Sequence, residues 1–440
     1  MEQQTRILTM LKSPAQVPPS FPPQLPGKPV SINSNMPESM PREMPPGMAA
    51  GPPGVTAGPP VGADGETIMA FGHRMAQTIN AGFLTLSIAV GRQTGLFEAM
   101  GSFHGQPKTS QEIADRAGLK ERYVREWLGA MLTSQIVEVE GRDRFFLPPH
   151  RAIFLGRDGP GEELAILACA LPVQSQVFEN IVECFRKDGP RGVPYDYFDK
   201  FHGFMSQCSN IWWGKNLVNC FLPTVPGLTE KLESGITVLD VGCGEGGASI
   251  LMAKQYPNSR FIGIDICSYA IQQAKGYAID AEVENVDFQI MDAHLMPDEW
   301  EFKFDYVLAS DSLHDMAHVG VVLREIQKVL KPNCHMSVLE VNARSDIVDN
   351  LSMPFASTFY TNSLFHCMTV SLSADGGEGL GNMWGREKAT AALTEGGFTV
   401  IDESVPEGWF NIHYVCIKTD KKGRSSSDSA TSTRTLKPDD

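Results

Sequence analysis

The stretch "VLDVGCGEGGASI", residues 238–250, decides the fold. It starts as an apolar run, meets an acid at Asp240, and turns through several glycines into a segment with helical composition. Glycines let the backbone come close to a ligand, and the free N–H groups at the start of the following helix face that ligand. The stretch therefore predicts a nucleotide-binding turn between a strand and a helix.

The chain around this turn repeats the alternation of strand and helix. Short buried-strand patterns are separated by helical patterns, and a closing pair of strands follows the last helix. This order predicts an α/β domain with a doubly wound, mostly parallel, seven-stranded sheet. The expected strands span residues 236–241, 260–266, 286–290, 304–309 and 336–341, with the closing pair in 398–405 and 409–418.

The glycine turn fits two kinds of ligand. Gly242, Gly244 and Gly247 give the G-x-G-x-x-G spacing of a dinucleotide site. Asp240 followed by Gly242, Gly244 and Gly246 gives the D-x-G-x-G-x-G spacing of an S-adenosylmethionine (SAM) site. The turn alone does not separate the two, because the glycines serve the same purpose in both.

Residues beyond the turn favour SAM. Asp265, at the end of the second expected strand, suits the ribose hydroxyls of either ligand. Asp292 and Ala293 follow the third strand, where SAM enzymes place an acid and an N–H group against the adenine edge. The closing strand pair is an addition that dinucleotide domains generally lack. A buried Asp240 would repel a pyrophosphate, whereas it would attract the ammonium of SAM.

With these residues the chain resembles a known family. Residues 236–418 look like a class I SAM-dependent methyltransferase, and residues 68–418 resemble a two-domain family, known from mycobacteria and animals, with a winged helix before that fold. The closer match rests on "RYVREWLGAM", "VLDVGCGEGG", "DSLHD", "MPFASTFYTNSLFHCMTVSL" and "GGEGLGNMWG". The resemblance implies SAM as cofactor and a homodimer built by the winged-helix part, which would also roof the substrate site without touching DNA. It implies SAM contacts by Asp240, Gly242, Gly244, Gly246, Asp265, Asp292 and Ala293, and we expect Cys243, Ile266 and Ser310 beside them.

The region before the sheet has a winged-helix pattern. A helical pattern runs from Ile68 through Met100, and a capping box of Thr109 and Glu112 starts a short helix that ends at Gly118. A second helix and two short strands joined by a turn follow. The second helix has Lys120, Arg122 and Arg125 against Glu121 and Glu126, so its charge is nearly balanced, which is not typical of a helix that reads DNA.

Composition divides the chain into five parts. Residues 1–66 hold 15 of the 30 prolines and predict a disordered arm, and the polar residues 420–440 predict a disordered tail. Between them we expect a winged-helix domain at 67–159, a helical connector or substrate lid rich in aromatic residues at 160–225, and the SAM-binding domain at 226–419.

The stretch "SDSLHDM", residues 310–316, carries the catalytic candidates. It follows the fourth strand, at the carboxyl edge of the sheet where ligands bind. Methyl transfer needs a base only when the acceptor carries a proton, and His314 is the best candidate, with Asp315 or Asp311 orienting its ring. The alternative is a histidine that stabilises a loop or a helix cap.

Other polar and aromatic residues are candidates for contacting the substrate, namely His366, Glu340 and Trp212. The pair His366 and Cys367 together with His314 suggests a metal at first sight. Their spacing does not support it, because the first two are adjacent and the third lies far away in the sequence, so we expect no metal.

Bulk properties narrow the function. The formal net charge of -15 argues against a protein that mainly binds nucleic acid or an anionic membrane. Nine cysteines without C-x-x-C spacing indicate a reducing compartment. With no apolar run of about 20 residues and no signal-peptide pattern, we expect a cytoplasmic protein without a membrane span.

The predicted function is transfer of a methyl group from SAM to oxygen, nitrogen or sulfur of a small, partly apolar molecule. One alternative is a SAM-binding regulatory protein, or a winged-helix DNA-binding protein, without turnover. The other is an NAD-dependent oxidoreductase.

Overall fold

The computed structural model describes residues 65–157, 159, 161–405 and 410–418. The described residues from Thr85 onward form one compact unit, and those up to Leu84 group separately. The expected Pro-rich arm, apart from its last two residues, and the expected tail lie outside the described residues.

The first helical region is interrupted. Helix α2 spans Ile68–Gln93, and a second helix, α3, spans Leu96–Gly101. Gly95 lies between them with a left-handed φ of 74°, a conformation that glycine adopts without strain. The prediction of one continuous helix through Met100 was therefore wrong, because the Thr94-Gly95 turn ends the first helix.

The winged-helix elements follow in the expected order. They are β1 (Lys108–Thr109), α4 (Ser110–Ala117), α5 (Glu121–Thr133), β2 (Glu138–Glu140) and β3 (Arg144–Phe146). The capping box of Thr109 and Glu112 is present, and Gly118 ends α4 in the left-handed conformation, which confirms both predictions. The strands form an antiparallel sheet in the order β1-β3-β2, so β1 adds a short strand to the two expected.

Short helices connect this domain to the sheet, as the aromatic-rich region predicted. Their bounds are α6 Pro149–Leu155, α7 Glu162–Leu167, α8 Ala170–Gln174, α9 Phe178–Cys184 and α10 Asp199–Asn216. Ile166, Phe204 and Cys208 pack in one buried cluster that joins α7 to α10. Helix α10 also contacts α12 (Gly247–Gln255), the helix that follows the glycine turn after β4.

One stretch of the connector meets the length and composition of a membrane span. Leu164–Cys184 has a mean hydropathy of 1.3 and is 44% buried within the protein. A core helix of a soluble protein passes the same test, so the stretch is weak evidence for a membrane. The sequence predicts no membrane span, because no uninterrupted apolar run reaches about 20 residues.

The large sheet has seven strands in the order β6-β5-β4-β7-β8-β10-β9. All neighbouring pairs are parallel except those of β10, which runs antiparallel to β8 and to β9. This arrangement confirms the predicted fold class. The bounds are close to those expected except for β8, which begins at Leu330 and not at Met336, because Pro332 and Asn333 interrupt its apolar pattern. The strands are β4 Thr237–Val241, β5 Arg260–Asp265, β6 Val286–Ile290, β7 Phe304–Ser310, β8 Leu330–Val341, β9 Phe398–Ser404 and β10 Asn411–Lys418.

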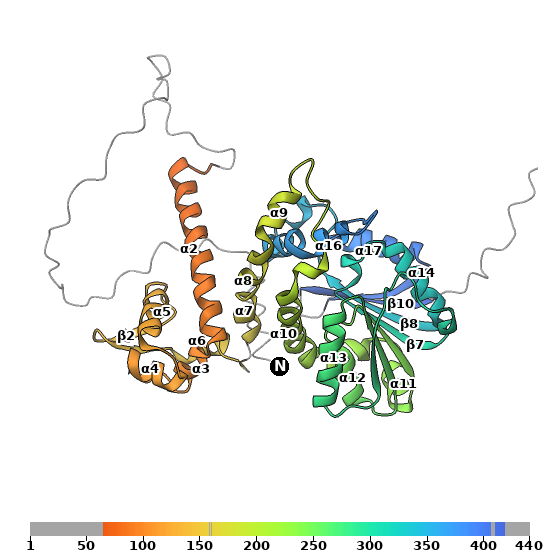
Figure 1. Ribbon diagram of the computed structural model, residues 1–440, viewed down its shortest axis with the longest axis horizontal. Coiled ribbons are helices and arrows are strands. Elements are labelled where there is room, and N and C mark those ends of the chain that lie inside the picture. The colour runs from red at the N-terminus through yellow and green to blue at the C-terminus, as the bar shows by residue number, and fades with distance from the viewer. Residues whose placement is uncertain (1–64, 158, 160, 406–409, 419–440) are drawn as a thin grey trace, which may run out of the picture. The chain divides into compact units, whose positions relative to one another are not determined.

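Helices cover both faces of this sheet (Figure 1). Side chains alternate along β4, so that Leu239 and Val241 share a cluster with α14 (Val319–Val329) and α17 (Gly385–Glu395). Val238 packs instead with α11 (Leu228–Ser234) and α12. Each buried aliphatic side chain of this kind contributes roughly 1.5–3 kcal/mol of hydrophobic stabilisation. Helix α13 (Ser268–Asp280) covers β6, while α15 (Ala356–Asn362) and α16 (Met368–Ser373) follow β8 in the chain.

Candidate active site

A cavity of about 680 Å³ opens at the carboxyl edge of the parallel strands. Ligands of open α/β sheets bind at this edge, because the loops after successive strands meet there. Fourteen of the residues singled out from the sequence line it: Trp212, Asp240, Gly242, Cys243, Gly244, Asp265, Ile266, Asp292, Ala293, Ser310, Asp311, His314, Asp315 and His366. The predicted cofactor residues and the predicted catalytic residues thus line one cavity.

The glycine turn lies at one end of the cavity. Gly242, Gly244 and Gly246 all have positive φ, at 72°, 53° and 80°. A Cβ atom on Gly242 would come within 2.5 Å of Ser312 Cβ, whereas one on Gly244 would have no atom within 4 Å. The backbone of Gly244 therefore faces open space, which is the cradle that a close-lying ligand requires.

Gly246 has a different role from the one expected. It does not line the cavity but precedes α12, and a Cβ there would come within 2.5 Å of the Phe288 ring. Its neighbour Gly247 lines the cavity instead. Gly246 is thus required by packing beneath the turn.

Asp265 is fixed by the turn itself. Its carboxylate accepts hydrogen bonds from the backbone N–H of Gly244 and of Cys267, both at 2.8 Å. One oxygen serves each donor, so each oxygen keeps a free acceptor site. A rigid carboxylate with two remaining acceptor sites at the cavity edge matches the two hydroxyls of a ribose.

Asp240 is buried at the floor of the same end, 3% exposed. Its carboxylate accepts one hydrogen bond, at 2.7 Å, from the hydroxyl of Ser249. Burial raises the pKa of Asp240 to about 7, the Ser249 hydrogen bond opposes the rise, and nearby Asp265 adds to it. A cation placed in the cavity next to Asp240 would stabilise its ionised form.

Asp292 is oriented by a histidine relay. Its Oδ1 accepts from the backbone N–H of His294 at 2.9 Å and lies 2.6 Å from His294 Nδ1. His294 Nε2 accepts a hydrogen bond from the backbone N–H of His318 at 3.1 Å. The ring proton is therefore on Nδ1, which donates a hydrogen bond to Asp292. Burial raises the pKa of Asp292, but the hydrogen bonds from His294 outweigh it and lower the pKa overall.

At the other end of the cavity, His314 is surrounded by acids. Its Nδ1 is hydrogen-bonded to Glu340, and its Nε2 lies 3.3 Å from Asp315 Oδ1. Trp384 donates from Nε1 to the same Glu340 oxygen at 3.2 Å. Burial lowers the pKa of His314, but the two carboxylates raise it well above its usual value. His314 therefore carries a proton at neutral pH.

Glu340 does not line the cavity, although the sequence proposed it as a substrate contact. It is 1% exposed and faces His314 and Trp384 from the end of β8. Its position is that of a residue that orients His314.

Asp311 joins this group through a strained backbone. Its φ is 48°, and its N–H donates to Leu339 O at 2.8 Å. Both its carboxylate oxygens accept from Nδ2 of Asn411, at 2.7 and 2.8 Å. Burial and the nearby carboxylate of Glu340 raise the pKa of Asp311 to about 7. A left-handed non-glycine residue next to a catalytic candidate is typical of functional sites.

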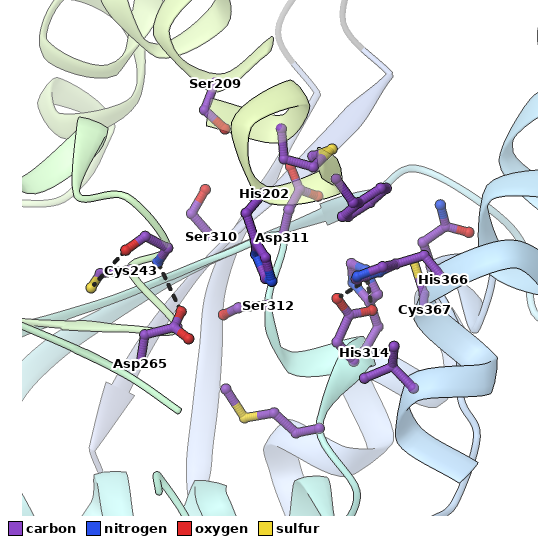
Figure 2. Close-up of a pocket in the computed structure, with 18 of the residues that line it drawn as sticks. His202, Ser209, Cys243, Asp265, Ser310, Asp311, Ser312, His314, His366 and Cys367 are labelled. Atoms are coloured by element: carbon purple, nitrogen blue, oxygen red, sulfur yellow. Dashed lines mark hydrogen bonds and ion pairs between the residues drawn. The ribbon is translucent and has the colours of Figure 1, made fainter. Parts of the chain in front are cut away.

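His366 contrasts with His314. It is 3% exposed, and its ring stacks on Phe201 at a centroid distance of 3.6 Å. Within the part of the chain that the structure describes, neither ring nitrogen makes a hydrogen bond. Its Nδ1 lies 3.6 Å from Asp315 Oδ2. Burial, together with the nearby His202 and His314, lowers its pKa well below the usual value, so the ring is neutral at pH 7. Figure 2 shows His314, His366 and Cys367 together, apart from Cys243 and Asp265.

Two groups of potential metal ligands occur here, although the sequence spacing did not suggest a metal. They are His314, Asp315 and Cys367, and Asp311, His314 and Glu340, with ligand atoms within 4.8 Å of one another. Burial raises the pKa of Cys367 to about 12, so its thiol stays protonated, and His314 is already protonated and held by Glu340. Both groups are consistent with a proton-sharing cluster, and the expectation of no metal stays a prediction.

Several cavity residues were missed by the sequence reading. Asn411 is the clearest, since it is a buried polar residue at the start of an otherwise apolar strand, and that signal was available. The others lie in segments that the sequence analysis covered without singling them out as contacts. They include His202, Asn210, Ser312, Phe355, Phe359, Asn382 and Phe410.

Comparison with known families confirms the expected class. Residues 232–392 match a methyltransferase domain, and residues 82–157 match an Rv2258c-like winged HTH domain. The chain thus carries a class I methyltransferase domain preceded by a winged-helix domain, and the resemblance stated from the sequence is confirmed.

Individual relatives match over the methyltransferase part. A demethylmenaquinone methyltransferase of Listeria monocytogenes is 24% identical over 165 residues, 37% of this chain and 63% of the relative. A 27-O-demethylrifamycin SV methyltransferase of Amycolatopsis mediterranei is 33% identical over 156 residues, 32% of this chain and 55% of the relative. The chain thus spans less than two thirds of these curated relatives.

Solved structures share the fold over most of the chain. Human N-acetylserotonin methyltransferase in complex with SAM aligns with a TM-score of 0.57 at 16% identity, covering 79% of this chain and 97% of that one. An O-methyltransferase family protein from Burkholderia thailandensis aligns with a TM-score of 0.57 at 13% identity, covering 81% and 99%. At these identities the likeness shows the fold alone.

Proposed function

We propose that the protein is a SAM-dependent methyltransferase that moves a methyl group to oxygen, nitrogen or sulfur of a small, partly apolar molecule. The observation that carries the proposal is that one cavity joins a glycine turn with three acids to a buried group of histidines and aromatic rings. The first set fits SAM, and the second set fits an acceptor whose proton has to be removed.

The cofactor would be held by residues of known position. Asp240 would receive the methionine ammonium, because a cation favours its ionised form. Asp265 would accept from the ribose hydroxyls with its two remaining acceptor sites. Asp292 would accept from the adenine amino group, with Ala293 beside it on the cavity wall.

Methyl transfer depends more on the position of the two reactants than on acid–base catalysis. SAM supplies a methyl group on sulfur: the acceptor lone pair forms the new bond to carbon as the C–S electron pair leaves with sulfur, giving S-adenosylhomocysteine. The protein has to hold the acceptor in line and exclude water. The aromatic and apolar wall, which includes Phe201, Trp212 and Phe359, provides this shielding.

Two histidines compete for the acceptor proton. His314, the candidate from the sequence, has both ring nitrogens facing acids and is protonated at neutral pH. His366 is neutral, its nitrogens are free of hydrogen bonds, and Asp315 would stabilise the imidazolium that forms. The geometry favours His366 as the proton acceptor and His314 as the group that holds Glu340 and Asp315 in place.

The winged-helix domain is better suited to protein contacts than to DNA. On α5, Arg122 pairs with Glu126 at 2.6 Å and Arg125 pairs with Glu121 at 3.3 Å, so its basic side chains are neutralised within the helix. Helix α2 exposes large apolar side chains, including Met69, Ile79 and Phe83. Exposed apolar surface of this kind supports the proposed homodimer.

The alternatives are less well supported. An NAD-dependent oxidoreductase would place a pyrophosphate near the buried Asp240, which repels it. A regulatory protein without turnover would need only the cofactor end, whereas the cavity also holds His366 next to Asp315, a pair that could accept a proton.

Labelled methyl transfer tests the proposal. The full chain would be incubated with SAM carrying a labelled methyl group and a small-molecule extract. We expect label in the small-molecule fraction, reduced when excess S-adenosylhomocysteine is added. Tight binding of S-adenosylhomocysteine without any label transferred across broad extracts would favour the regulatory alternative.

A further inference from the structure

The end of the cavity away from the glycine turn is acidic. Among the described residues that line the cavity there is no lysine and no arginine. Asp311 and Asp315 line it, and Glu340 lies directly behind His314. The only basic group among them is the protonated His314, which is hydrogen-bonded to Glu340. Burial raises the pKa of Asp311 to about 7 and raises that of Asp315, so a cation placed between them would stabilise their ionised forms.

The same end has buried polar atoms without hydrogen-bond partners. His366 and Asn382 are 97% and 94% buried, and both line the cavity. Among the described residues, the two ring nitrogens of His366 and the Oδ1 atom of Asn382 have no hydrogen-bond partner. Two of these three atoms are acceptors, Oδ1 of Asn382 and the unprotonated nitrogen of His366, because a neutral imidazole carries one proton. Buried polar atoms are rarely left unpaired in native proteins, so these two acceptors point to a ligand that brings donors.

Aromatic rings form the rest of the wall. Phe410 makes edge contacts with Phe355 and Phe359, at centroid distances of 5.3 and 5.6 Å, next to Asn411. Phe201 and Trp212 also line the cavity. Aromatic faces attract cations, and they also pack well against a planar apolar group.

We propose that the polar end of the substrate is an amine, which enters as an ammonium and binds among Asp311, Asp315 and His366. This rests on the proposed function and specifies nitrogen as the acceptor atom. A carboxylate or phosphate at this end would meet Asp311 and Asp315 and, among the described lining residues, no lysine or arginine, and burial of such an uncompensated charge is costly. An ammonium supplies both the missing positive charge and the missing donors.

Methylation of the amine needs only the groups present in the cavity and SAM. The ammonium first gives one proton to the imidazole of His366, which becomes an imidazolium beside Asp315. The freed nitrogen lone pair then forms the bond to the methyl carbon as the C–S bond breaks towards sulfur. The products are a methylated ammonium and S-adenosylhomocysteine.

The test uses three probes of similar size on the full chain saturated with S-adenosylhomocysteine, so that the cofactor end is filled. The probes are 2-phenylethylamine, 2-phenylethanol and phenylacetate, and binding is measured by calorimetry. We expect the amine to bind about tenfold or more tightly than the alcohol, and phenylacetate to bind most weakly. Equal binding of all three, or tightest binding of phenylacetate, would overturn the proposal.

Variants then locate the preference. In Asp315→Asn the advantage of the amine over the alcohol should fall to about threefold or less, since one charge-assisted contact is lost. Asp311→Asn provides a second variant, since asparagine also tolerates the left-handed backbone at this position. Asp402→Asn on β9, an exposed residue outside the cavity, makes the same charge change and should leave the ratio unchanged. A ratio unaffected by both cavity variants would place the amine elsewhere and contradict the proposal.

Cofactor binding separates a failure of the amine proposal from a failure of the proposed function. If S-adenosylhomocysteine does not bind, the proposed function fails before any probe is added. If it binds and the amine has no advantage, the methyltransferase assignment stands and the amine substrate is wrong.

Discussion

The two ends of the cavity are built in different ways. The cofactor end comes from a few residues close in the chain, Asp240 to Gly247, whose backbone shape is set by glycines and by one carboxylate, Asp265. The acidic end is assembled from side chains on α10, the loop after β7, β8, β10 and the helices after β8. Its contacts join residues far apart in the chain, such as Asp311 with Asn411 and Phe201 with His366. The first end depends on local conformation and the second on long-range packing, so they should respond differently to substitution.

Replacing the two buried histidines should have the largest effect. His366→Ala removes the neutral proton acceptor, and we expect kcat to fall by about 10²- to 10⁴-fold with the affinity for SAM unchanged. His314→Ala leaves Glu340 and Asp315 buried without their cation, so we expect a loss of about 3–5 kcal/mol in stability. Turnover assays and thermal unfolding of both variants give the comparison. The opposite pattern, turnover lost in a stable His314→Ala and kept in His366→Ala, would restore His314 as the base.

Asp265 tests the cofactor end. In Asp265→Ala the ribose hydroxyls and two backbone N–H groups lose their acceptor, and we expect SAM binding to weaken by about 1–3 kcal/mol. Calorimetry on the folded variant measures the change, with Asp402→Asn as a control that should not alter it. An unchanged dissociation constant would remove Asp265 from the ribose site.

Asp240 should make cofactor binding depend on pH. Its pKa in the free protein is raised to about 7, so it is protonated below that pH and has to ionise to receive an ammonium. Affinity for S-adenosylhomocysteine should therefore fall as pH is lowered from 7.5 to 5.5, by at most about tenfold per pH unit. Asp240→Asn should bind more weakly and lose this dependence. Parallel pH profiles for the two proteins would mean that another group titrates.

The raised pKa of Asp240 affects stability in the opposite direction to cofactor affinity, because stability falls as pH rises. Because the folded pKa of Asp240 lies above its ordinary value of 3.8, its protonated form favours the folded state, and this contribution is lost as pH rises through about 7. Asp240→Asn keeps the shape of the side chain without the buried charge. The variant should therefore be at least as stable as the parent at pH 8, as measured by denaturant unfolding, although it binds cofactor less well.

The smallest effect is expected far from the cavity. Thr109→Ala removes the capping box of α4 and should cost about 1 kcal/mol in stability. Cofactor affinity should not change, because Thr109 does not line the cavity. A loss of affinity equal to that of Asp265→Ala would show that binding follows overall stability and not the sheet edge.

The cofactor end could be predicted from sequence for a physical reason. A strand, a glycine turn and an acid at the end of the next strand are local patterns, and each fixes backbone direction within a few residues. The strand bounds and the capping box followed from periodicity and local hydrogen bonds in the same way. Gly95 shows the limit, since the apolar pattern continues across a turn that ends the helix.

The acidic end could be predicted only in part. His314 and its neighbouring acids were found because they directly follow a strand. Their partners were not recognised as such, since Glu340 was predicted to contact the substrate and Asn411 was not singled out. The contacts of Asn411 with Asp311 and of His366 with Phe201 join residues far apart in the chain, and no local pattern encodes such pairings. Whether a histidine is protonated depends on these partners, so the sequence could name both histidines but could not separate their roles.

The central claim is that the glycine turn binds SAM, and direct calorimetry tests it best. The full chain would be titrated with SAM, S-adenosylhomocysteine and NAD under the same conditions. We predict saturable binding of SAM and S-adenosylhomocysteine, weakened in Asp265→Ala, and no heat from NAD. Binding of NAD alone would contradict the account of "VLDVGCGEGGASI", and binding of none of the three would contradict a cofactor site at this turn.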